Sequence, residues 1–413
     1  MKLNSKRNKL RTINTNKWPI KPLGELLYSL ESGRRPKGGS INNGIPSIGA
    51  EHLHESGQLN FNSIKYIPPN FYNSMRNGKI LKRDILIVKD GATTGKVSFV
   101  NDNFPFENAA VNEHVFILRP NKELLDARYT FYYLYSINGQ KQIHSDFRGS
   151  AQGGISRGFI GKIFIPLPPI NIQREIAEYL DKVTNAIQNR KKAIKLTDQF
   201  LKSAFVEIFG DPLNNPKGWQ TGIIKNAVQY SEYGTSKKSN KEKLGVPILG
   251  MSNLNSSGEL DLTKLNYVEL SENEFNKLKL TKGDVIFNRT NSTELIGKTA
   301  YWDRNIDAVL ASYLIKLTMN SKVDPIWFSN LLNTKYYKSL FALKCKKAVN
   351  QSNISPTLLK EFPMYFPPKE LQMQYAEIFK QIRLLKDKQN KSEIELDNLF
   401  NNLMQKAFNG ELF

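Results

Sequence analysis

The sequence contains very little cysteine or histidine. Cys345 is the single cysteine among 413 residues, and there are four histidines. A lone thiol excludes an internal disulfide framework and any zinc site built from several cysteines, and it suits a reducing cytoplasm. Only His52 and His54 stand close together, and no third ligand accompanies them, so we predict that the chain binds no metal.

Long hydrophobic runs are missing as well. No stretch approaches the roughly eighteen apolar residues of a membrane span. The basic residues at the N-terminus are not followed by the apolar segment of a signal peptide. We therefore expect a cytoplasmic protein with no membrane partner.

Acidic residues are in the minority. The chain has 38 Asp and Glu against 59 Lys and Arg, and its formal net charge is +21. Such an excess favours a polyanionic partner, because Lys and Arg that contact phosphates release condensed counterions. The 40% of hydrophobic residues is enough for two or three domains with real cores. Charge alone leaves open a protein that merely has a basic surface.

The motifs of common nucleic-acid enzymes are absent too. None of the Pro-Pro pairs lies in the Asn/Asp-Pro-Pro-Tyr/Phe loop with which an adenine methyltransferase holds a flipped base. The segment 91–97 differs from a phosphate-binding loop, because its glycines are too close and Val97 replaces the magnesium-binding hydroxyl. No acidic pair with a following Glu-x-Lys indicates a nuclease. We therefore predict no catalytic residues and no bound cofactor.

What the sequence does contain is an internal duplication. The segment Ile-Pro-Ser-Ile-Gly-Ala-Glu-His-Leu at 45–53 recurs as Val-Pro-Ile-Leu-Gly-Met-Ser-Asn-Leu at 246–254. Other pairs follow in the same order: Trp18 with Trp219, Tyr66 with Tyr267, Gly95-Lys96 with Gly297-Lys298, and Pro168-Pro169 with Pro367-Pro368. A repeat of about 200 residues is a whole domain. Two copies of one fold suit a duplex site with two halves, although a binding protein with two ligand sites is an alternative.

Each copy begins with a β-rich part. Short apolar or alternating runs at 85–88, 97–100 and 115–118, and later at 285–287 and 313–317, predict strands. Helical spacing appears in these parts only around 123–143 and 325–345. We predict two α+β domains, each with a curved and largely antiparallel sheet.

A long helical seam follows each late Pro-Pro pair. Apolar residues recur at spacings of three, four or seven from Ile172 to Ile208 and from Leu371 to Ala407. Each seam has a polar gap at its middle, and antiparallel pairing would bring the two gaps together. We predict that the helices pair as an antiparallel coiled coil with pseudo-twofold symmetry. The alternative is two separate amphipathic helices, each lying on its own domain.

The order of β-rich domain, Pro-Pro pair and long helix, present twice, resembles the specificity subunit of Type I restriction–modification systems. The resemblance is carried by the segments Ser32-Gly33-Arg34-Arg35-Pro36-Lys37-Gly38-Gly39, Gly44-Ile45-Pro46-Ser47-Ile48-Gly49-Ala50-Glu51-His52-Leu53, Lys89-Asp90-Gly91-Ala92-Thr93-Thr94-Gly95-Lys96 and Gly149-Ser150-Ala151-Gln152-Gly153-Gly154-Ile155-Ser156. It extends from about Trp18 to Phe413. One departure is that the family's usual Glu-Gln after the Pro-Pro pair is here Ile172-Gln173 and Leu371-Gln372.

The resemblance implies a non-catalytic subunit that binds double-stranded DNA. Each target-recognition domain would read one half of a bipartite site, and the helices would set the spacing and bind two methyltransferase subunits. Motor–nuclease subunits would add restriction, while S-adenosylmethionine, ATP and Mg would be bound by partner subunits only. A stand-alone DNA- or RNA-binding regulator and an enzyme with an unrecognised centre are the alternatives.

On this interpretation the chain divides into five segments. These are a basic tail at 1–17, a first recognition domain at 18–168, a first spacer helix at 169–212, a second recognition domain at 213–367 and a second spacer helix at 368–413. The residues predicted for helix pairing and partner binding are Ile176, Tyr179, Val183, Ile187, Ile378, Ile382, Leu385 and Leu403.

Candidate DNA contacts are polar and basic side chains in glycine-bearing loops, because these side chains match base edges and phosphates. In the first domain they are Arg34, Arg35, Lys37, Lys89, Thr93, Arg148, Gln152 and Arg157. In the second domain they are Lys237, Lys238, Asn253, Arg289, Asn291, Lys346, Lys347, Asn350 and Gln351. For any one of them, a solvated surface charge is the alternative.

Overall fold

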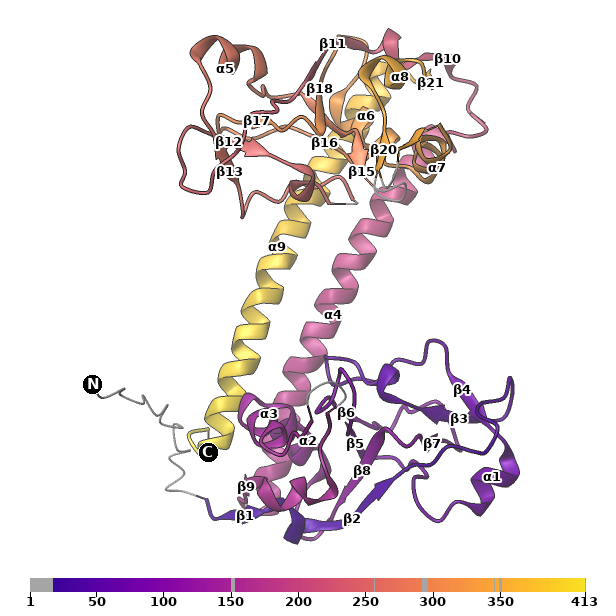
Figure 1. Ribbon diagram of the computed structural model, residues 1–413, viewed down its shortest axis with the longest axis vertical. Helices are drawn as coiled ribbons and strands as arrows, with labels where there is room; N and C mark the ends of the chain where they lie inside the picture. The colour runs from indigo at the N-terminus through magenta and orange to yellow at the C-terminus, as the bar shows by residue number, and fades with distance from the viewer. Residues whose placement is uncertain are drawn as a thin grey trace, which may run out of the picture. The chain divides into compact units, whose positions relative to one another are not determined.

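The computed structural model describes residues 18–149, 153–255, 257–291, 296–344, 346–348 and 351–412, with only the backbone at 291, 346–348, 351 and 352. The basic tail at 1–17 lies outside these ranges. The chain divides into two units, the first made of Met1–Lys191 with Lys391–Phe413 and the second of Lys192–Asn390. Each unit therefore contains one β-rich domain and half of each long helix (Figure 1).

The first unit contains a four-stranded antiparallel sheet in the order β2-β8-β5-β6 and a three-stranded sheet in the order β4-β3-β7. The strands are β1 (Ile20–Pro22), β2 (Leu27–Ser32), β3 (Ile45–Ile48), β4 (Lys65–Ile67), β5 (Ile85–Val88), β6 (Val97–Phe99), β7 (Ala110–Val111), β8 (Val115–Pro120) and β9 (Phe164–Pro166). The helices of the domain are α1 (Pro69–Ser74), α2 (Ala127–Tyr135) and α3 (Ile137–His144). The strands predicted at 85–88, 97–100 and 115–118 are confirmed.

Strand β5 shows why these residues form a buried strand. Successive side chains of a strand point to opposite faces of the sheet. Ile85 and Ile87 accordingly lie in the core that includes α2 and α3, whereas Leu86 and Val88 lie in a second core on the other face. Because both faces are covered, the strand is continuously apolar instead of alternating.

The second unit repeats this topology, with the orders β11-β18-β14-β16 and β13-β12-β17. Its strands are β10 (Gln220–Ile223), β11 (Val228–Tyr233), β12 (Val246–Leu249), β13 (Asn266–Val268), β14 (Val285–Asn288), β15 (Thr290–Asn291), β16 (Thr299–Tyr301), β17 (Val309–Leu310), β18 (Leu314–Met319), β19 (Lys346–Ala348), β20 (Gln351–Asn353) and β21 (Pro363–Phe366). Its helices are α5 (Glu272–Leu278), α6 (Pro325–Leu332), α7 (Lys335–Lys344) and α8 (Pro356–Lys360). The duplication is therefore one of fold as well as of sequence.

The two long helices begin directly after the Pro-Pro pairs. Helix α4 (Ile170–Phe209) and helix α9 (Lys369–Phe408) have 40 residues each, which is about 60 Å at 1.5 Å per residue. Proline is tolerated at the start of a helix, because the N–H groups there have no acceptor within the helix and the missing N–H of proline costs no hydrogen bond. Among the described residues, no helix combines the length and the apolar character needed to cross a bilayer.

The helices run antiparallel in each unit, as predicted. In the first unit, Ile176 and Ile187 of α4 share one core with Phe400 and Met404 of α9. In the second unit, the rings of Phe205 on α4 and Tyr375 on α9 are 5.3 Å apart. The start of α4 thus packs on the end of α9, and the end of α4 packs on the start of α9.

Polar residues interrupt the seam where the sequence shows its gaps. Thr197 donates a hydrogen bond to Gln389 Oε1 at 3.2 Å, and both side chains are buried. Lys191 Nζ lies 3.7 Å from Glu393 Oε1. The middle of each helix therefore meets polar groups of the other, which satisfies side chains that apolar neighbours would leave unpaired.

One glutamine attaches each long helix to its domain. Gln173 accepts a hydrogen bond from Asp126 N at 2.8 Å and donates to Leu124 O and Pro168 O. Gln372 accepts from Asp324 N at 2.8 Å and donates to the carbonyls of Lys322 and Pro367. Both side chains are fully buried. These contacts explain why each copy has a glutamine at this position.

Candidate nucleic-acid interface

The candidate loops of the first domain lie at one end of its four-stranded sheet. Ser32 at the end of β2 pairs with Phe116, and Val88 at the end of β5 pairs with Val115. The loops at 33–39, 89–95 and 112–114 therefore leave the sheet at the same end. A fourth loop joins them, because Asp90 forms an antiparallel bridge with Gly154 and Ile155 N donates to Lys89 O at 2.7 Å.

Charged side chains connect three of these loops. Arg35 Nε lies 2.8 Å from Glu113 Oε1, and His114 Nε2 lies 3.4 Å from the same oxygen. His114 Nδ1 lies 2.5 Å from Asp90 Oδ1, and Lys89 Nζ lies 3.8 Å from the other oxygen of Asp90. Sequence reasoning named Arg35 and Lys89 but missed Glu113, His114 and Asp90. The signal available was that all three follow or precede buried strands.

Backbone geometry explains the glycine in the first of these loops. A Cβ atom on Gly33 would lie 1.8 Å from Val111 O, so no larger residue fits there. The neighbouring Gly38 and Gly39 have φ angles of +96° and +82°, which L side chains rarely adopt. Arg34 and Lys37 are exposed on this tight loop, and Thr93 is half-buried on the loop at 89–95.

Among the remaining candidates of the first domain, Arg148 lies beside Asp146. Arg148 is 71% exposed and lies 3.5 Å from Asp146, whose side chain also accepts hydrogen bonds from Ser156 N and Lys162 Nζ. The Lys162 hydrogen bond is the main cause that lowers the pKa of Asp146 to about 2. Arg157 donates to Leu30 O, and Gln152 lies outside the described residues. Asp146 therefore organises this loop as a carboxylate.

In the second domain, three candidates are placed at the corresponding end of the sheet. Lys237 Nζ lies 2.7 Å from Glu274 Oε2, and the neighbouring Lys238 is exposed. The guanidinium of Arg289 lies 4.8 Å from the centre of the Tyr233 ring and donates to Ser312 O at 3.2 Å. Arg289 follows β14 as Lys89 follows β5, so both copies have a cation directly after the central strand.

Asn253 requires a correction. Its side chain is 7% exposed, accepts a hydrogen bond from Gly250 N and donates to Asp261 O and Lys264 O. The buried His52 accepts from Gly49 N in the same way. Because these hydrogen bonds hold a turn and occupy the amide, we assign Asn253 to the scaffold and remove it from the DNA contacts.

The last candidates belong to a small sheet in the order β15-β20-β19. Its backbone pairs Asn291 with Ser352, Lys346 with Asn353 and Lys347 with Ser352. Gln351 pairs with Ala348. The side chains of Asn291, Lys346, Lys347 and Gln351, and the whole of Asn350, lie outside the described part of the structure.

The residues predicted for helix pairing and partner binding separate into buried and exposed sets. Ile176 and Ile187 are buried in the core of the first unit, with Val183 and Leu403 packed against it. Ile378 and Ile382 are half-buried in the second unit. Tyr179 is 50% exposed and Leu385 is 46% exposed, so neither belongs to the seam between the helices.

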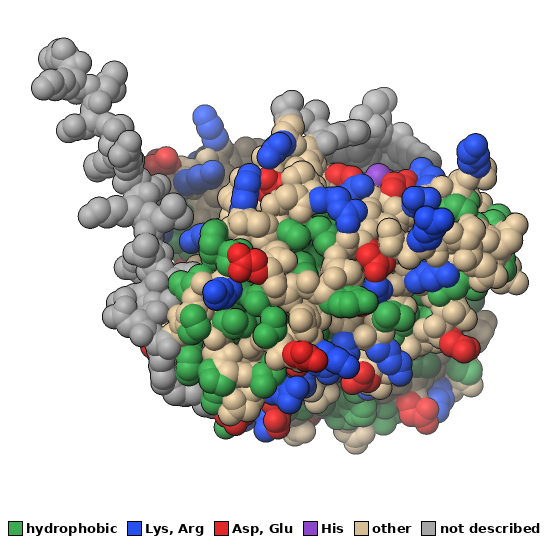
Figure 2. Space-filling model, turned by 90° about the horizontal axis from the view of Figure 1, so that it is seen from below, with side chains coloured by type: hydrophobic (Ala, Val, Ile, Leu, Met, Phe, Trp, Pro, Cys, Tyr) green, Lys and Arg blue, Asp and Glu red, His purple; other side chains and the backbone are tan. Residues whose placement is uncertain are grey.

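Basic side chains are spread over the surface. Figure 2 shows Lys and Arg singly or in small groups among acidic and apolar side chains on the face seen from below in Figure 1. In the described ranges, no group of three or more His, Cys, Asp and Glu side chains could hold a metal ion. Exposed cations such as Arg34, Arg35 and Lys238 lie on the candidate loops, which suits contact with phosphates and base edges.

Two tandem α+β domains with basic, glycine-bearing loops at one end of each sheet, each followed by a long helix, define a two-part DNA-recognition protein. The chain matches the type I restriction modification DNA specificity domain twice, over residues 15–197 and 216–396, and it belongs to this family. It is thus a specificity subunit, the non-catalytic component of a type I restriction–modification system.

Named specificity subunits are similar to one or both copies of the repeat in this chain. A protein of Methanocaldococcus jannaschii that bears the name of the MjaX type I restriction enzyme specificity subunit is 32% identical over 201 residues, which are 48% of this chain and 47% of that protein. The EcoKI specificity subunit of Escherichia coli K12 is 23% identical over 419 residues, or 96% of this chain and 89% of that subunit. The crystal structure of a type I S subunit from M. genitalium has the same fold, with a TM-score of 0.59 at 17% identity over 99% of this chain and 98% of that one.

Proposed function

We propose that each domain reads one half of a bipartite site on double-stranded DNA through the loops at one end of its four-stranded sheet. The observation that carries this proposal is the repeated topology, which puts exposed cations on the same loops of both copies. Arg34 and Arg35 are the best base-reading candidates in the first domain, because a guanidinium fork matches the two acceptors of guanine. In the second domain, the candidates on the corresponding loop after β11 are Lys237 and Lys238.

Acidic residues of the first interface add a second kind of contact. Glu113 and Asp90 are joined to Arg35 and Lys89 by ion pairs, so they fix these cations on the loops before DNA arrives. A carboxylate can also accept a hydrogen bond from the amino group of cytosine. Preformed side chains lose less conformational entropy on binding, which favours a single sequence over its competitors.

The long helices set the distance between the half-sites and bind two methyltransferase subunits in this proposal. Apolar side chains stay exposed along them, among them Tyr179, Leu196, Phe200, Leu384 and Leu385. Exposed apolar residues on paired helices are suited to a protein partner. Motor–nuclease subunits complete the complex in the cytoplasm, and the partner subunits bind the S-adenosylmethionine, ATP and Mg that methylation and restriction use.

Reciprocal variants test the assignment of half-sites. Arg34→Ala with Arg35→Ala should weaken reading of one half-site, and Lys237→Ala with Lys238→Ala should weaken reading of the other. Each lost base contact should cost about 1–3 kcal/mol of discrimination at its own position. The measurement is the map of methylated sites in cells that carry each variant with its methyltransferase partner.

Each pair of variants is the control for the other. Damage confined to different half-sites supports separate reading by the two domains. Equal loss at both half-sites for either variant would show that its cations hold the DNA backbone or the complex and do not read bases.

A further inference from the structure

A cavity of about 500 Å³ lies at the opposite end of the first unit's sheet from the candidate DNA loops. It is formed where β5 begins, where β8 ends and where α2 begins, with α4 beside them. Its lining is unusually basic. The cationic side chains are Lys82, Arg83, Arg119, Lys122, Arg128 and Arg174, and the acidic ones are Asp84 and Asp126.

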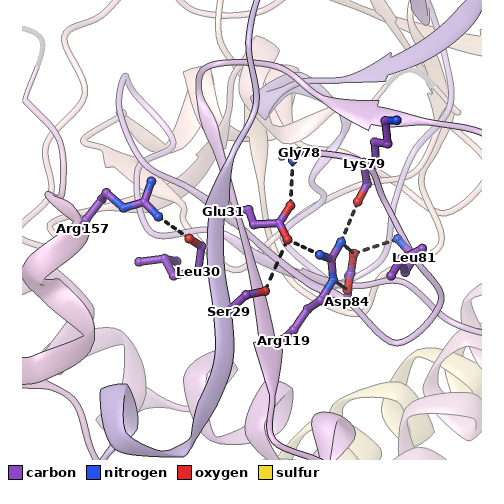
Figure 3. A network of polar contacts seen from close by, with 9 residues as sticks. All are labelled: Ser29, Leu30, Glu31, Gly78, Lys79, Leu81, Asp84, Arg119 and Arg157. Atoms are coloured by element: carbon purple, nitrogen blue, oxygen red, sulfur yellow. Dashed lines mark hydrogen bonds and ion pairs between the residues drawn. The ribbon is translucent and has the colours of Figure 1, made fainter. Parts of the chain in front are cut away.

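Arg119 holds the floor of this cavity together (Figure 3). Its Nε and NH2 atoms donate to the two oxygens of Asp84 at 2.7 and 2.9 Å, NH2 also donates to Lys79 O, and NH1 donates to Glu31. The Arg119 side chain is 17% exposed and that of Asp84 is 2% exposed. Four of the five N–H donors of Arg119 are occupied within the fold, so its main role is to neutralise the floor.

The other carboxylates near the cavity are neutralised as well. Arg83 NH2 lies 2.9 Å from Asp126 Oδ2, and Arg128 NH1 lies 2.6 Å from Asp181 Oδ2. Lys82, Lys122 and Arg174 are exposed and, among the described residues, have no carboxylate within 4.0 Å. Even when Glu31 and Asp181 are counted, the cations outnumber the carboxylates. The rim is therefore positive over a neutral floor.

The second unit shows that the fold does not need this charge. Thr318 pairs with Tyr230 where Arg119 pairs with Ser29, and Thr318 Oγ1 donates to Asp284 at 2.6 Å. The second unit keeps the two carboxylates of the cavity, as Asp284 and Asp324. The other three arginines are replaced, Arg83 by Gly283, Arg128 by Ile326 and Arg174 by Met373. The second unit thus has the same scaffold without any of the four arginines, so the fold does not require the positive charge of the first unit.

We propose that this cavity binds a small phosphate-bearing molecule of the nucleoside di- or triphosphate class. A cavity of about 500 Å³ has the size of a small-molecule site. Lys and Arg that converge from several elements are the groups that bind phosphate, and the arginine fork matches its oxygens. Lys122 and Arg174 come from different elements, and Leu81 and Pro120 in the lining offer apolar surface to the rest of the ligand.

Duplex DNA fits this cavity less well as the source of phosphate. The cavity is at the far end of the sheet from the loops at 33–39 and 89–95. If both domains read DNA, as proposed above, a backbone contact needed for reading should be present in both copies, yet the second copy lacks it. This second point rests on the proposed function, whereas the cavity and its charge do not.

The test is isothermal titration calorimetry of the full-length chain at low salt with ATP, inorganic tripolyphosphate, AMP and adenosine. ATP and tripolyphosphate should bind, AMP should bind roughly tenfold or more weakly, and adenosine should not bind, because each phosphate adds ionic contacts. Lys122→Ser with Arg174→Met, which brings in residues of the second unit, should weaken ATP binding by roughly tenfold or more. Lys322→Ala with Met373→Ala, on the corresponding side of the second unit, is the matched control and should change nothing.

Two further measurements separate loss of ligand binding from loss of folding and from loss of DNA reading. Thermal unfolding should show that the Lys122→Ser, Arg174→Met chain is folded, since both side chains are exposed. The map of methylated sites should be unchanged for this variant, so that failure here and failure of the DNA-reading proposal give different results. The inference is overturned if ATP does not bind at roughly 1 mM, if binding survives the double change, or if the same change abolishes binding to duplex DNA.

Discussion

At the residue scale, equivalent positions in the two copies donate a hydrogen bond to the corresponding backbone carbonyl from different side chains. Gln140 donates its side-chain amide to Gly95 O at 3.1 Å, and Lys338 donates its ammonium to Gly297 O. Both carbonyls belong to the Gly-Lys pair of the repeat. Burial, and then the nearby charge of Lys298, lowers the pKa of Lys338 to about 7 from its ordinary value of 10.5. The side-chain amide of Gln140 is neutral, so its burial opposes no charge.

This difference predicts a pH dependence of stability. Between about pH 7 and pH 10.5 the unfolded chain holds a proton on Lys338 that the folded chain has lost, so the free energy of unfolding should rise with pH in this window. Below pH 7 the lysine is protonated in both states and adds no slope. Lys338→Gln keeps a donor and should flatten the rise, as followed by denaturant unfolding at pH 7, 8.5 and 10. An identical slope in this variant would show that Lys338 is not the titrating group.

At the element scale, the helix seam differs between the units. Lys386 of α9 is buried and lies 2.7 Å from both Asp198 of α4 and Glu259 of the domain. Burial disfavours its charge, but hydrogen bonds to Asp198 and Glu259 outweigh that effect and raise the pKa of Lys386. The equivalent position in the first copy of the repeat is Ile187, which lies in the apolar core of the first unit. At this position the second domain is attached to the helices by ion pairs, whereas the first unit has apolar packing there.

Replacing Lys386 should make the second unit less stable. Lys386→Met keeps the length of the side chain but leaves Asp198 and Glu259 without their cation, and we expect a loss of about 1–2 kcal/mol, because both carboxylates are more than a third exposed. The loss should shrink in 1 M salt, which screens ion pairs. Ile187→Met is the matched control in the first unit, and its effect should not depend on salt. Denaturant unfolding at low and high salt measures both, and a salt-independent effect of Lys386→Met would contradict an ionic attachment.

At the scale of the whole molecule, the continuous helices α4 and α9 suggest how the recognition gap is set. Each helix belongs to both units, which meet in sequence at Lys191 and at Asn390. Because the helices pair within each unit, the register is kept only if both are lengthened together. A ruler built this way should respond in whole helical turns and not in single residues.

Matched insertions test this ruler. Four residues added after Lys191 and four after Asn390 lengthen each helix by about 6 Å and turn it by about 400°, so the apolar seam stays nearly in register. Since one base pair rises about 3.4 Å, the variant should recognise the same half-sites with a gap longer by one or two base pairs. Two-residue insertions turn each helix by about 200° and should prevent assembly. Mapping of methylated sites gives the gap, and an unchanged gap in an active four-residue variant would contradict a helical ruler.

Much of this protein follows from the sequence alone. The duplication, the buried strands at 85–88 and 285–287 and the long helices after each Pro-Pro pair are local patterns of hydrophobicity and turn residues, and such patterns need no knowledge of distant contacts. The glycine-bearing loops that carry Arg34, Arg35 and Lys89 are also visible, because their motifs are contiguous.

The tertiary structure alone decided what these side chains do. Asn253 looks like a loop residue in the sequence, but its amide is occupied by carbonyls of residues 261 and 264. Tyr179 fits the apolar spacing of α4, yet it is half exposed because the seam is narrower than the sequence pattern. The basic cavity combines residues from 81 to 174 that share no motif. Burial, hydrogen-bond partners and summed charge depend on segments far apart in the chain, and only folding brings those segments together.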